Sequence, residues 1–310
     1  MTQPRILAIV VTYNGNHWMN HCLGSLRQSS IPLEVIVVDN QSTDNTVALV
    51  KEHFPKVQLI EADENLGFGR ANNIGLKKAL REDYDYAFLL NQDAWVEPDT
   101  IEILINIHRQ YPEYGILSPV HLNREESHLD NKFARFVNQA ENRDLMSDLL
   151  LPGRSLQDVY TVEFVNAAAW LISYDCLRKV GGFDPLFFHY GEDEDYVQRT
   201  KYHGFKVGFA PRARIVHDRE GYVKQSDLRR SLPTQYKDCL IILKNVYRSF
   251  DTNLYITLRN EVYYALVALF TLDLSQVWTK LKLIRTIIAR SSAARRSRQY
   301  CMTHTEAYLT

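Results

Sequence analysis

The chain has 310 residues, of which 45% are hydrophobic and 24% charged, and its formal net charge is −1. This length allows one large domain or two, and the composition excludes disordered and fibrous proteins. The charge is unevenly distributed, because seven basic residues and no acidic residue lie between Leu274 and Thr305. The net charge alone therefore indicates no class of partner, but the C-terminal stretch is strongly basic.

Cysteine usage and hydropathy indicate where the protein works. The four cysteines stand far apart in the sequence and form no CxxC pair, which favours a reducing compartment. The first residues lack the basic start, the long apolar run and the cleavage site of a signal peptide. The longest apolar stretch, Val262 to Leu272, has about half of the ~20 residues that a spanning helix needs. We therefore expect a cytoplasmic protein without a spanning helix.

Roughly the first 120 residues alternate apolar, β-rich runs with helical patterns. Strands are expected at 6–11, 33–38, 57–60 and 86–90, and helices at 17–28, 43–54, 69–81 and 98–110. Such alternation is typical of right-handed βαβ units, in which a parallel sheet carries helices on both faces. The predicted fold class is therefore α/β with a mostly parallel central sheet.

The remainder of the chain divides into three parts. The stretch 123–158 is polar and charged and is expected to form a long connection or lid. Beyond it we expect a strand at 162–173, a turn-rich loop at 179–188, a helix at 193–203 and a strand at 207–216. From Ser231 the pattern is helical. The sequence thus predicts a sheet domain over 1–230 and a C-terminal helical extension with a basic tail over 231–310.

Polar residues follow the predicted strands directly, at 12–14, 39–40, 61–65 and 91–93. Because ligands of parallel sheets bind outside the carboxyl ends of the strands, these residues should line one crevice. Asp39 could there accept a hydrogen bond from a nucleobase imide or a ribose hydroxyl. It could equally cap the next helix or form an Asx turn.

The glycine-rich segment 65–75 partly matches the GxGxxG pattern. It follows the third predicted strand, whereas the first strand has no glycine-rich turn, and this weighs against an NAD-binding Rossmann domain. The glycines could bring backbone N–H groups and Arg70 toward a diphosphate. The alternative is that they only form a tight entry into a helix.

Acidic residues and one histidine could carry the chemistry. Asp93 follows an apolar strand, where a carboxylate suits a divalent cation that also holds diphosphate oxygens, although a helix cap has the same pattern. The four acids at 192–195 raise each other's proton affinity, so one of them could act as a general base. Asp193 could instead cap the helix that follows. His217 could be a ligand of the same cation or an ordinary hydrogen-bonded histidine.

Taken in order, these segments resemble the family-two inverting glycosyltransferases, and especially their rhamnosyltransferase-like branch. The resemblance extends over about residues 5 to 220 and is carried by Val11-Thr12-Tyr13-Asn14, Val38 to Asp44, Asn65 to Gly75, Asn91-Gln92-Asp93, Gly181 to Asp184, Glu192-Asp193 and His217. It implies a GT-A fold and a nucleotide-sugar donor, either dTDP-rhamnose or a UDP-sugar. It also implies a glycan or lipid-linked acceptor in the synthesis of cell-surface polysaccharide.

The resemblance further implies a role for each matching residue. Asp193 would be the base, and Asp93 and His217 would hold Mn²⁺ or Mg²⁺. Glu192 and Tyr190 would support the base or contact the acceptor. The residues that it assigns to the nucleotide sugar are Thr12, Tyr13, Asn14, Asp39, Asn65, Gly67, Arg70, Asn73, Asn91 and Gln92. In this set Asn91 stands where the family's DxD motif has its first acid, a departure that is frequent in the rhamnosyltransferase-like branch.

The chemistry of an inverting transferase agrees with these residue types. Such an enzyme needs a base for the acceptor hydroxyl and positive charge beside the departing diphosphate. A sugar-nucleotide nucleotidyltransferase is one alternative, but it would need a glycine-rich, basic motif after the first strand, which the residues at 11–18 do not supply. A non-catalytic nucleotide-sugar-binding assembly subunit is another, and the retention of Asp93, Asp193 and His217 argues against it.

The basic tail has two interpretations. Residues 278–298 carry Trp278 and several aliphatic side chains among the cations, which is the pattern of an interfacial amphipathic helix on anionic lipid. Peripheral contact with the inner face of the cell membrane would then follow. The alternative is a helix that packs on the catalytic domain and exposes a basic face to solvent. Nucleic acid is not an expected partner, because no reading motif is present and the rest of the chain is acidic.

Overall fold

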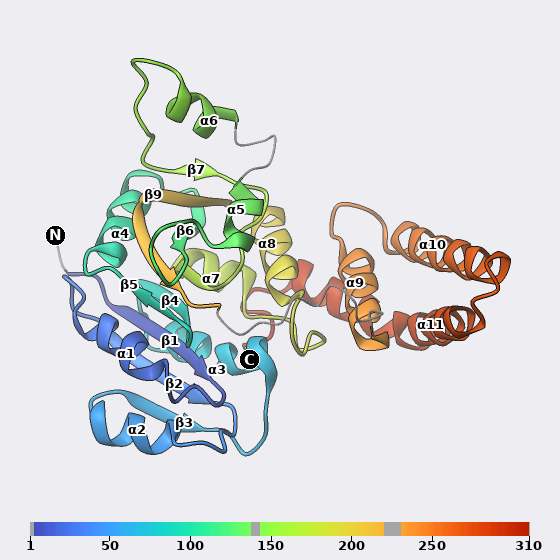
Figure 1. Ribbon diagram of the computed structural model, residues 1–310, viewed down its shortest axis with the longest axis horizontal. Helices are drawn as coiled ribbons and strands as arrows, with labels where there is room; N and C mark the ends of the chain where they lie inside the picture. The colour runs from blue at the N-terminus through green and yellow to red at the C-terminus, as the bar shows by residue number, and fades with distance from the viewer. Residues whose placement is uncertain (1–2, 138–142, 220–230, 310) are drawn as a thin grey trace.

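The computed structural model describes residues 3–137, 143–219 and 231–309. Within these residues a nine-stranded sheet has the strand order β3-β2-β1-β4-β8-β6-β9-β5, and β7 pairs with β9. Figure 1 shows helices on both faces of this sheet and a pair of long helices that projects away from it. The predicted α/β fold with a C-terminal helical extension is therefore confirmed.

The half of the sheet around β1 follows the βαβ pattern expected from the sequence. Its elements are β1 Ile6–Thr12, α1 Met19–Arg27, β2 Glu34–Asp39, α2 Thr46–His53, β3 Gln58–Glu61, α3 Gly67–Arg81 and β4 Tyr86–Asn91. Strands β1 to β4 are parallel to one another. Leu7 and Ile9 of β1 face the core formed with α3, whereas Ala8 and Val10 face the core formed with α1 and α2. This double burial explains the continuous apolar run of the strand.

The other half of the sheet is mixed. Its elements are β5 Ala94–Val96, α4 Thr100–Gln110, β6 Tyr114–Leu122, α5 Asn131–Val137, α6 Arg143–Leu150, β7 Tyr160–Thr161, β8 Ala169–Ser173, α7 Tyr174–Val180, α8 Glu192–Tyr202 and β9 Lys206–His217. β8 is antiparallel to β4 and β6, and β5 and β7 are antiparallel to β9. β6 and β9 are parallel. The sheet as a whole is therefore less parallel than the sequence suggested.

Three departures from the predicted elements have physical explanations. The stretch 123–158 contains α5 and α6 within its described residues rather than only a connection. The predicted strand 162–173 shortens to β8, because Val165 and Ala167 are apolar to fill the core and not to pair in a strand. β6 was not predicted, because Pro119 interrupts its apolar run, and the pairing with β9 is irregular at that point.

The C-terminal region consists of α9 Leu232–Lys244, α10 Phe250–Phe270 and α11 Leu274–Thr303. These helices form a third apolar core, in which Leu243, Leu283 and Ile287 are fully buried and which also takes in Phe187 from the loop before α8. α10 and α11 form a hairpin that points away from the sheet (Figure 1). None of the described helices combines the length and the apolar character that crossing a bilayer requires.

A buried ion cluster joins this helical region to the sheet. Lys244, at the end of α9, contacts Asp184, and its Nζ lies 2.9 Å from Asp195 Oδ1. Arg199 Nε of α8 donates to Asp195 Oδ2 at 2.8 Å. All four residues are buried, where charges persist only when they are paired. The cluster therefore fixes α9 against α8.

The residues after α11 return to the sheet domain. Gly182 N donates to Ala307 O at 2.8 Å, and Leu309 is buried in the core with α3 and α7. Gly181 has φ +82°, and a Cβ atom there would lie 2.1 Å from Ala307 O. Only glycine can therefore occupy position 181 without displacing the tail. Figure 1 shows this end of the chain beside α3.

Candidate functional site

The polar residues predicted to line a crevice meet at the carboxyl edge of the parallel strands. Thr12 pairs with Asp39 across β1 and β2, and Val11 pairs with Asn91 across β1 and β4. Gln92 Oε1 accepts hydrogen bonds from Thr12 Oγ1 at 2.8 Å and from the Tyr13 backbone N–H at 2.9 Å. The strand ends thus hold one another in place before any ligand binds.

Asp39 is buried at this edge and is held by a turn. Its carboxylate accepts hydrogen bonds from Ser42 N at 2.8 Å and from Ser42 Oγ at 2.5 Å. Asn14 N donates to Ser42 Oγ at 2.9 Å, and Asn14 Oδ1 accepts from Thr43 N at 2.8 Å. Asp39 therefore holds a local turn through the N–H three residues on, and a contact with a nucleobase stays a prediction.

The glycine-rich segment forms a tight entry into α3. Gly67 has φ +76°, and a Cβ atom on it would lie 2.0 Å from Phe188 O, so this glycine lets the loop before α8 approach closely. Asn65 Oδ1 accepts from Gly67 N at 2.9 Å. Arg70 is exposed, and its Nη2 lies 3.2 Å from Glu64 Oε1. These contacts agree with the helix-entry interpretation, and the predicted roles of Gly67, Asn65 and Arg70 at the nucleotide sugar stay predictions.

Asn73 is engaged away from the strand ends. Its Nδ2 donates to Phe183 O at 2.8 Å, and Phe183 N donates to its Oδ1 at 2.7 Å. Both polar groups of the amide are thus occupied by the backbone of the loop that leads to α8. These bonds give Asn73 a place in positioning that loop, and its predicted role at the nucleotide sugar stays a prediction.

Asp93 and His217 come together although they are far apart in the sequence. β5 and β9 pair so that Ala94 lies opposite His217, and His217 Nε2 is 3.3 Å from Asp93 Oδ1. Burial raises the pKa of Asp93, but the hydrogen bond and charge of His217, together with Arg219, outweigh it and hold this pKa below its ordinary value. Two ligands of one cation lie about 3 Å apart when each is about 2.1 Å from the ion, so the pair fits a divalent cation.

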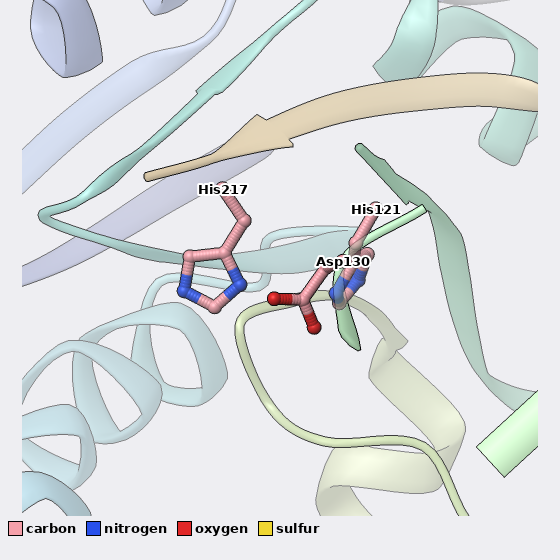
Figure 2. Close-up of side chains that lie close together, drawn as sticks. All are labelled: His121, Asp130 and His217. Carbon is pink, nitrogen blue, oxygen red and sulfur yellow. The ribbon is translucent and has the colours of Figure 1, made fainter. Parts of the chain in front are cut away.

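A second group of possible metal ligands adjoins this pair. His121, Asp130 and His217 offer ligand atoms that all lie within 4.8 Å of one another, and all three residues are buried. Figure 2 shows a ring nitrogen of His217 turned toward the Asp130 carboxylate. Nδ1 of His121 and Nδ1 of His217 have no hydrogen-bond partner in the described part of the chain. Free lone pairs on buried imidazoles are what a cation site requires.

The surroundings of this second group set its charge state. Burial, followed by the charges of His217 and Arg219, holds the pKa of His121 well below its ordinary value, so the imidazole stays neutral. Asp130 is already paired, because Arg219 Nε lies 2.8 Å from its Oδ2. Sequence reasoning missed His121 and Asp130, since one ends an unpredicted strand and the other lies in the polar stretch taken as a connection.

The acidic cluster forms the first turn of α8. Glu192 is buried, and its Oε2 has no hydrogen-bond partner among the described residues. Burial, and then the charge of Asp193, raises the pKa of Glu192 to about 8. Asp193 is only partly buried, and its Oδ1 accepts from Glu194 N at 2.9 Å. Burial raises the pKa of Asp193 as well. Asp195 belongs instead to the ion cluster with Lys244.

Tyr190 is affected by the charges of Asp93 and of the acidic first turn of α8. Burial raises its pKa, Arg219 lowers it, and the charges of Glu192, Asp93 and Asp193 raise it further. The phenol therefore lies within electrostatic reach of both groups. The residue is nevertheless 47% exposed, so it is open to contact from a ligand. That the predicted metal ligands and the predicted base share one site stays a prediction.

The chain is similar in sequence to known glycosyltransferases. Residues 7–178 match the family model described as Glycosyl transferase family 2. The chain is 26% identical over 230 residues to an N-acetylglucosaminyl-diphospho-decaprenol L-rhamnosyltransferase of Mycobacterium tuberculosis, which covers 67% of this chain and 74% of that protein. It is 24% identical over 213 residues to the dTDP-rhamnosyl transferase RfbF of Shigella flexneri, with 68% of each chain covered.

The fold is shared with a glycosyltransferase of solved structure. The mannosyltransferase PcManGT of Pyrobaculum calidifontis, in complex with GDP-Man and Mn²⁺, superposes with a TM-score of 0.54 at 20% identity. The superposition covers 94% of this chain and 76% of that one. The sheet and its flanking helices therefore have the GT-A fold that the motifs implied.

Proposed function

The chain belongs to glycosyl transferase family 2 and is of its rhamnosyltransferase-like type, and on this basis we propose that it is an inverting hexosyltransferase. It moves a sugar from a nucleotide-diphosphate donor to a hydroxyl group of a glycan or a lipid-linked glycan in the synthesis of cell-surface polysaccharide. The observation that carries this proposal is the approach of His217 Nε2 to 3.3 Å from Asp93 Oδ1, two residues after the end of β4. Such a pair can hold the positive charge that a departing diphosphate needs, and the acidic first turn of α8 offers the proton acceptor that transfer to a hydroxyl group also needs.

The donor side of the site lies at the ends of β1, β2 and β4. Thr12, Asp39 and Gln92 sit side by side there, and the ring of Tyr13 is 47% exposed. Asp39 reads the imide of thymine or uracil with the acceptor capacity that Ser42 leaves free. We take dTDP-rhamnose as the first candidate donor, because the Shigella relative is named a dTDP-rhamnosyl transferase, and a UDP-sugar as the second.

Asp93 and His217 would hold Mn²⁺ or Mg²⁺. Their close approach, with His217 Nε2 3.3 Å from Asp93 Oδ1, supports a cation at this place. When bound, the cation supplies positive charge to the diphosphate that leaves. The residue that precedes this pair in the DxD position is Asn91, which offers an amide oxygen where many family members have a carboxylate.

Asp193 is the proposed base, and Glu192 supports it. A group whose pKa is raised to about 8 is protonated at neutral pH, so Glu192 cannot accept the acceptor's proton there. Asp193 is more exposed and can reach a hydroxyl in the crevice. As its carboxylate takes that proton, the hydroxyl oxygen bonds to the anomeric carbon, and the bond from this carbon to the diphosphate oxygen breaks on the opposite face.

The division of labour along the chain follows from this arrangement. We propose that 1–230 binds the donor and performs catalysis, because it contains every residue assigned above. The region 231–310 is an accessory helical unit, since its core of Leu243, Leu283 and Ile287 takes only Phe187 from the rest of the described chain. Its end, at Leu309, packs in a core of the sheet.

A thermal-shift panel tests the proposal. A donor that binds the folded chain raises its melting temperature by mass action, so dTDP-rhamnose with Mn²⁺ should give the largest shift among dTDP- and UDP-sugars. Transfer to a synthetic lipid-linked glycan, followed by assignment of the anomeric configuration of the product, then tests the reaction and its inversion. Retention of configuration, or stabilisation by nucleoside triphosphate and sugar 1-phosphate instead of a nucleotide sugar, would contradict the proposal.

A further inference from the structure

The far end of the α10–α11 hairpin exposes an unusual amount of apolar surface. We call the apolar tip the group formed by Val262, Leu266, Phe270, Leu272, Leu274 and Trp278. Phe270 is 86% exposed, Leu272 81% and Trp278 66%. Apolar side chains this exposed and this close together mark an interaction surface.

The exposure of the tip excludes a role as core. The run from Val262 to Leu272 contains no charged residue, and such a run of about 11 residues is either a buried core segment or an interfacial one. The structure leaves most of it exposed. At 3.6 residues per turn, the exposed positions of α10, including Val262, Tyr263 and Val267, cover well over half of the helix circumference. A helix that is apolar on most sides is suited to immersion rather than to pairing along one stripe.

The charges beside the apolar tip indicate which kind of surface the tip contacts. Lys282 and Arg285 follow it on α11, are exposed, and form no ion pair with any described residue. The sequence from Leu274 to Thr305 contains no acidic residue. A second copy of the chain would bring equal positive charges together, whereas an anionic lipid surface neutralises them. The tyrosines and Trp278 around the tip also have the amphipathic character that residues at a lipid–water boundary share.

The sequence suggested a membrane contact along the basic helix, but in the structure much of that helix is occupied by contacts within the fold. Leu283 and Ile287 of the basic helix are buried among residues of α9 and α10, in a core that takes only Phe187 from the described part of the catalytic domain. The later part of α11 contacts that domain, as the alternative interpretation held for the whole helix, with Ser297 bonded to Asp184 and His203 Nε2 3.0 Å from Cys301 O. Part of the basic face is also used within the fold, because Arg298 donates to backbone carbonyls and Lys280 Nζ lies 2.7 Å from Glu261 Oε2. The surface left for lipid is the hairpin tip and not the length of α11.

We propose that the apolar tip inserts into the headgroup region of an anionic membrane, with Lys282 and Arg285 on the phosphates above it. The hairpin then acts as a monotopic anchor and does not span the bilayer. The proposal is independent of the donor, the metal and the base. Vesicle binding therefore succeeds or fails separately from glycosyl transfer.

Flotation of the full chain with vesicles is the test. Phe270→Ser, Leu272→Ser and Trp278→Ser together should lower the partition onto vesicles of equal phosphatidylcholine and phosphatidylglycerol about tenfold or more. These residues are exposed, so the fold should persist, whereas truncation of α11 would uncover Leu283 and Ile287. The matched control replaces three exposed leucines of the α6 region by serine, namely Leu149, Leu150 and Leu151, and should bind like the parent chain.

Two further measurements separate the possible outcomes. Lys282→Gln with Arg285→Gln should reduce binding to the anionic vesicles about tenfold and leave binding to pure phosphatidylcholine unchanged. Brominated lipid should quench tryptophan emission, and Trp278→Phe should abolish the quenching. Equal flotation of the tip variant, or failure of the parent chain to float, overturns the proposal. A dimer in solution that the tip substitutions dissociate, without vesicle binding, would overturn it in favour of self-association.

Discussion

The two sides of the candidate site differ in how their buried polar groups are satisfied. At the ends of β1 and β2, Thr12 is bonded to Gln92, and Asp39 is bonded to Ser42. On the side formed by β9 and α8, Nδ1 of His217 and Oε2 of Glu192 lack a partner in the part of the chain that is described. Buried polar groups are normally paired. The side at β1 and β2 therefore has the pairing of a structural region, whereas the side at β9 and α8 has the unpaired groups expected of a ligand-binding region. Substitutions should therefore cost stability on the first side and activity on the second.

The largest effect should come from Asp93→Ala. Loss of this carboxylate removes a proposed cation ligand, so turnover should fall by about 10²- to 10³-fold and Mn²⁺ binding should weaken. Titration calorimetry with Mn²⁺ and donor measures both losses, and Asp63→Ala, an exposed acid at the same edge, is the control. If Asp93→Ala binds Mn²⁺ as the parent does and His121→Gln does not, the cation is held by His121, Asp130 and His217 instead.

Asp193→Asn should be next in size. The amide cannot take a proton, so turnover should fall by on the order of 10² or more while nucleotide affinity stays nearly unchanged. Glu192→Gln keeps the size and neutrality of the protonated side chain and should lose much less activity. Single-turnover kinetics beside nucleotide titrations give both quantities. The assignment of the base is wrong if the two variants exchange these effects.

The pH dependence of stability should reveal Glu192 directly. Its pKa is about 8 in the folded chain, against an ordinary value of 4.5, so the folded state holds the proton more tightly. Stability is therefore unaffected below about pH 4.5, falls as the pH rises toward 8, and is fully reduced above that. Glu192→Gln cannot ionise, so its melting temperature should decline several degrees less than that of the parent between pH 5 and 9. Parallel melting curves for parent and variant would exclude a raised pKa.

The smallest predicted effects are changes in the free energy of unfolding. They should be larger for a substitution on the side at β1 and β2 than for one on the side at β9 and α8. Ser42→Ala removes one partner of the buried Asp39 carboxylate and should cost about 1–2 kcal/mol of unfolding free energy, whereas Ser42→Thr keeps the hydroxyl. His121→Phe removes the unpartnered Nδ1 and keeps the stacking on Phe133, but it also removes the bond between Nε2 and Ser118 Oγ at 3.0 Å. Combined with Ser118→Ala, which removes the other partner of that bond, it should cost less than about 1 kcal/mol. Urea denaturation measures both, and a larger cost for this double variant than for Ser42→Ala would reverse the comparison.

The sequence predicted the scaffold side well, because its signals are local. Each strand from β1 to β4 is an apolar run that ends in polar residues, and the polar ends meet because parallel strands share an edge. Asp93 and His217 were also paired correctly, although only the ordered motifs linked them. The contact between these two residues depends on the antiparallel pairing of β5 with β9, which the periodicity of the sequence does not predict.

The ligand-binding side could be predicted only in part. His121 lies in β6, whose apolar run Pro119 interrupts, and Asp130 lies in a polar stretch with no motif. Their approach to His217 arises from the pairing of β6 with β9 across a long sequence separation. The exposure of residues 262–272 could not be predicted either, because an apolar run of that length has the same sequence pattern in a buried core and at a surface.

The return of the chain end to the sheet has a practical consequence for anyone who modifies this protein. Ala307 and Leu309 hold the loop at Gly182, and the next residue of that loop, Phe183, is held by Asn73. The same loop leads to Tyr190 and the acidic turn. An affinity tag or deletion placed after α11 therefore perturbs the proton-accepting end of the site from the opposite end of the polypeptide, and a purification handle belongs elsewhere on the molecule.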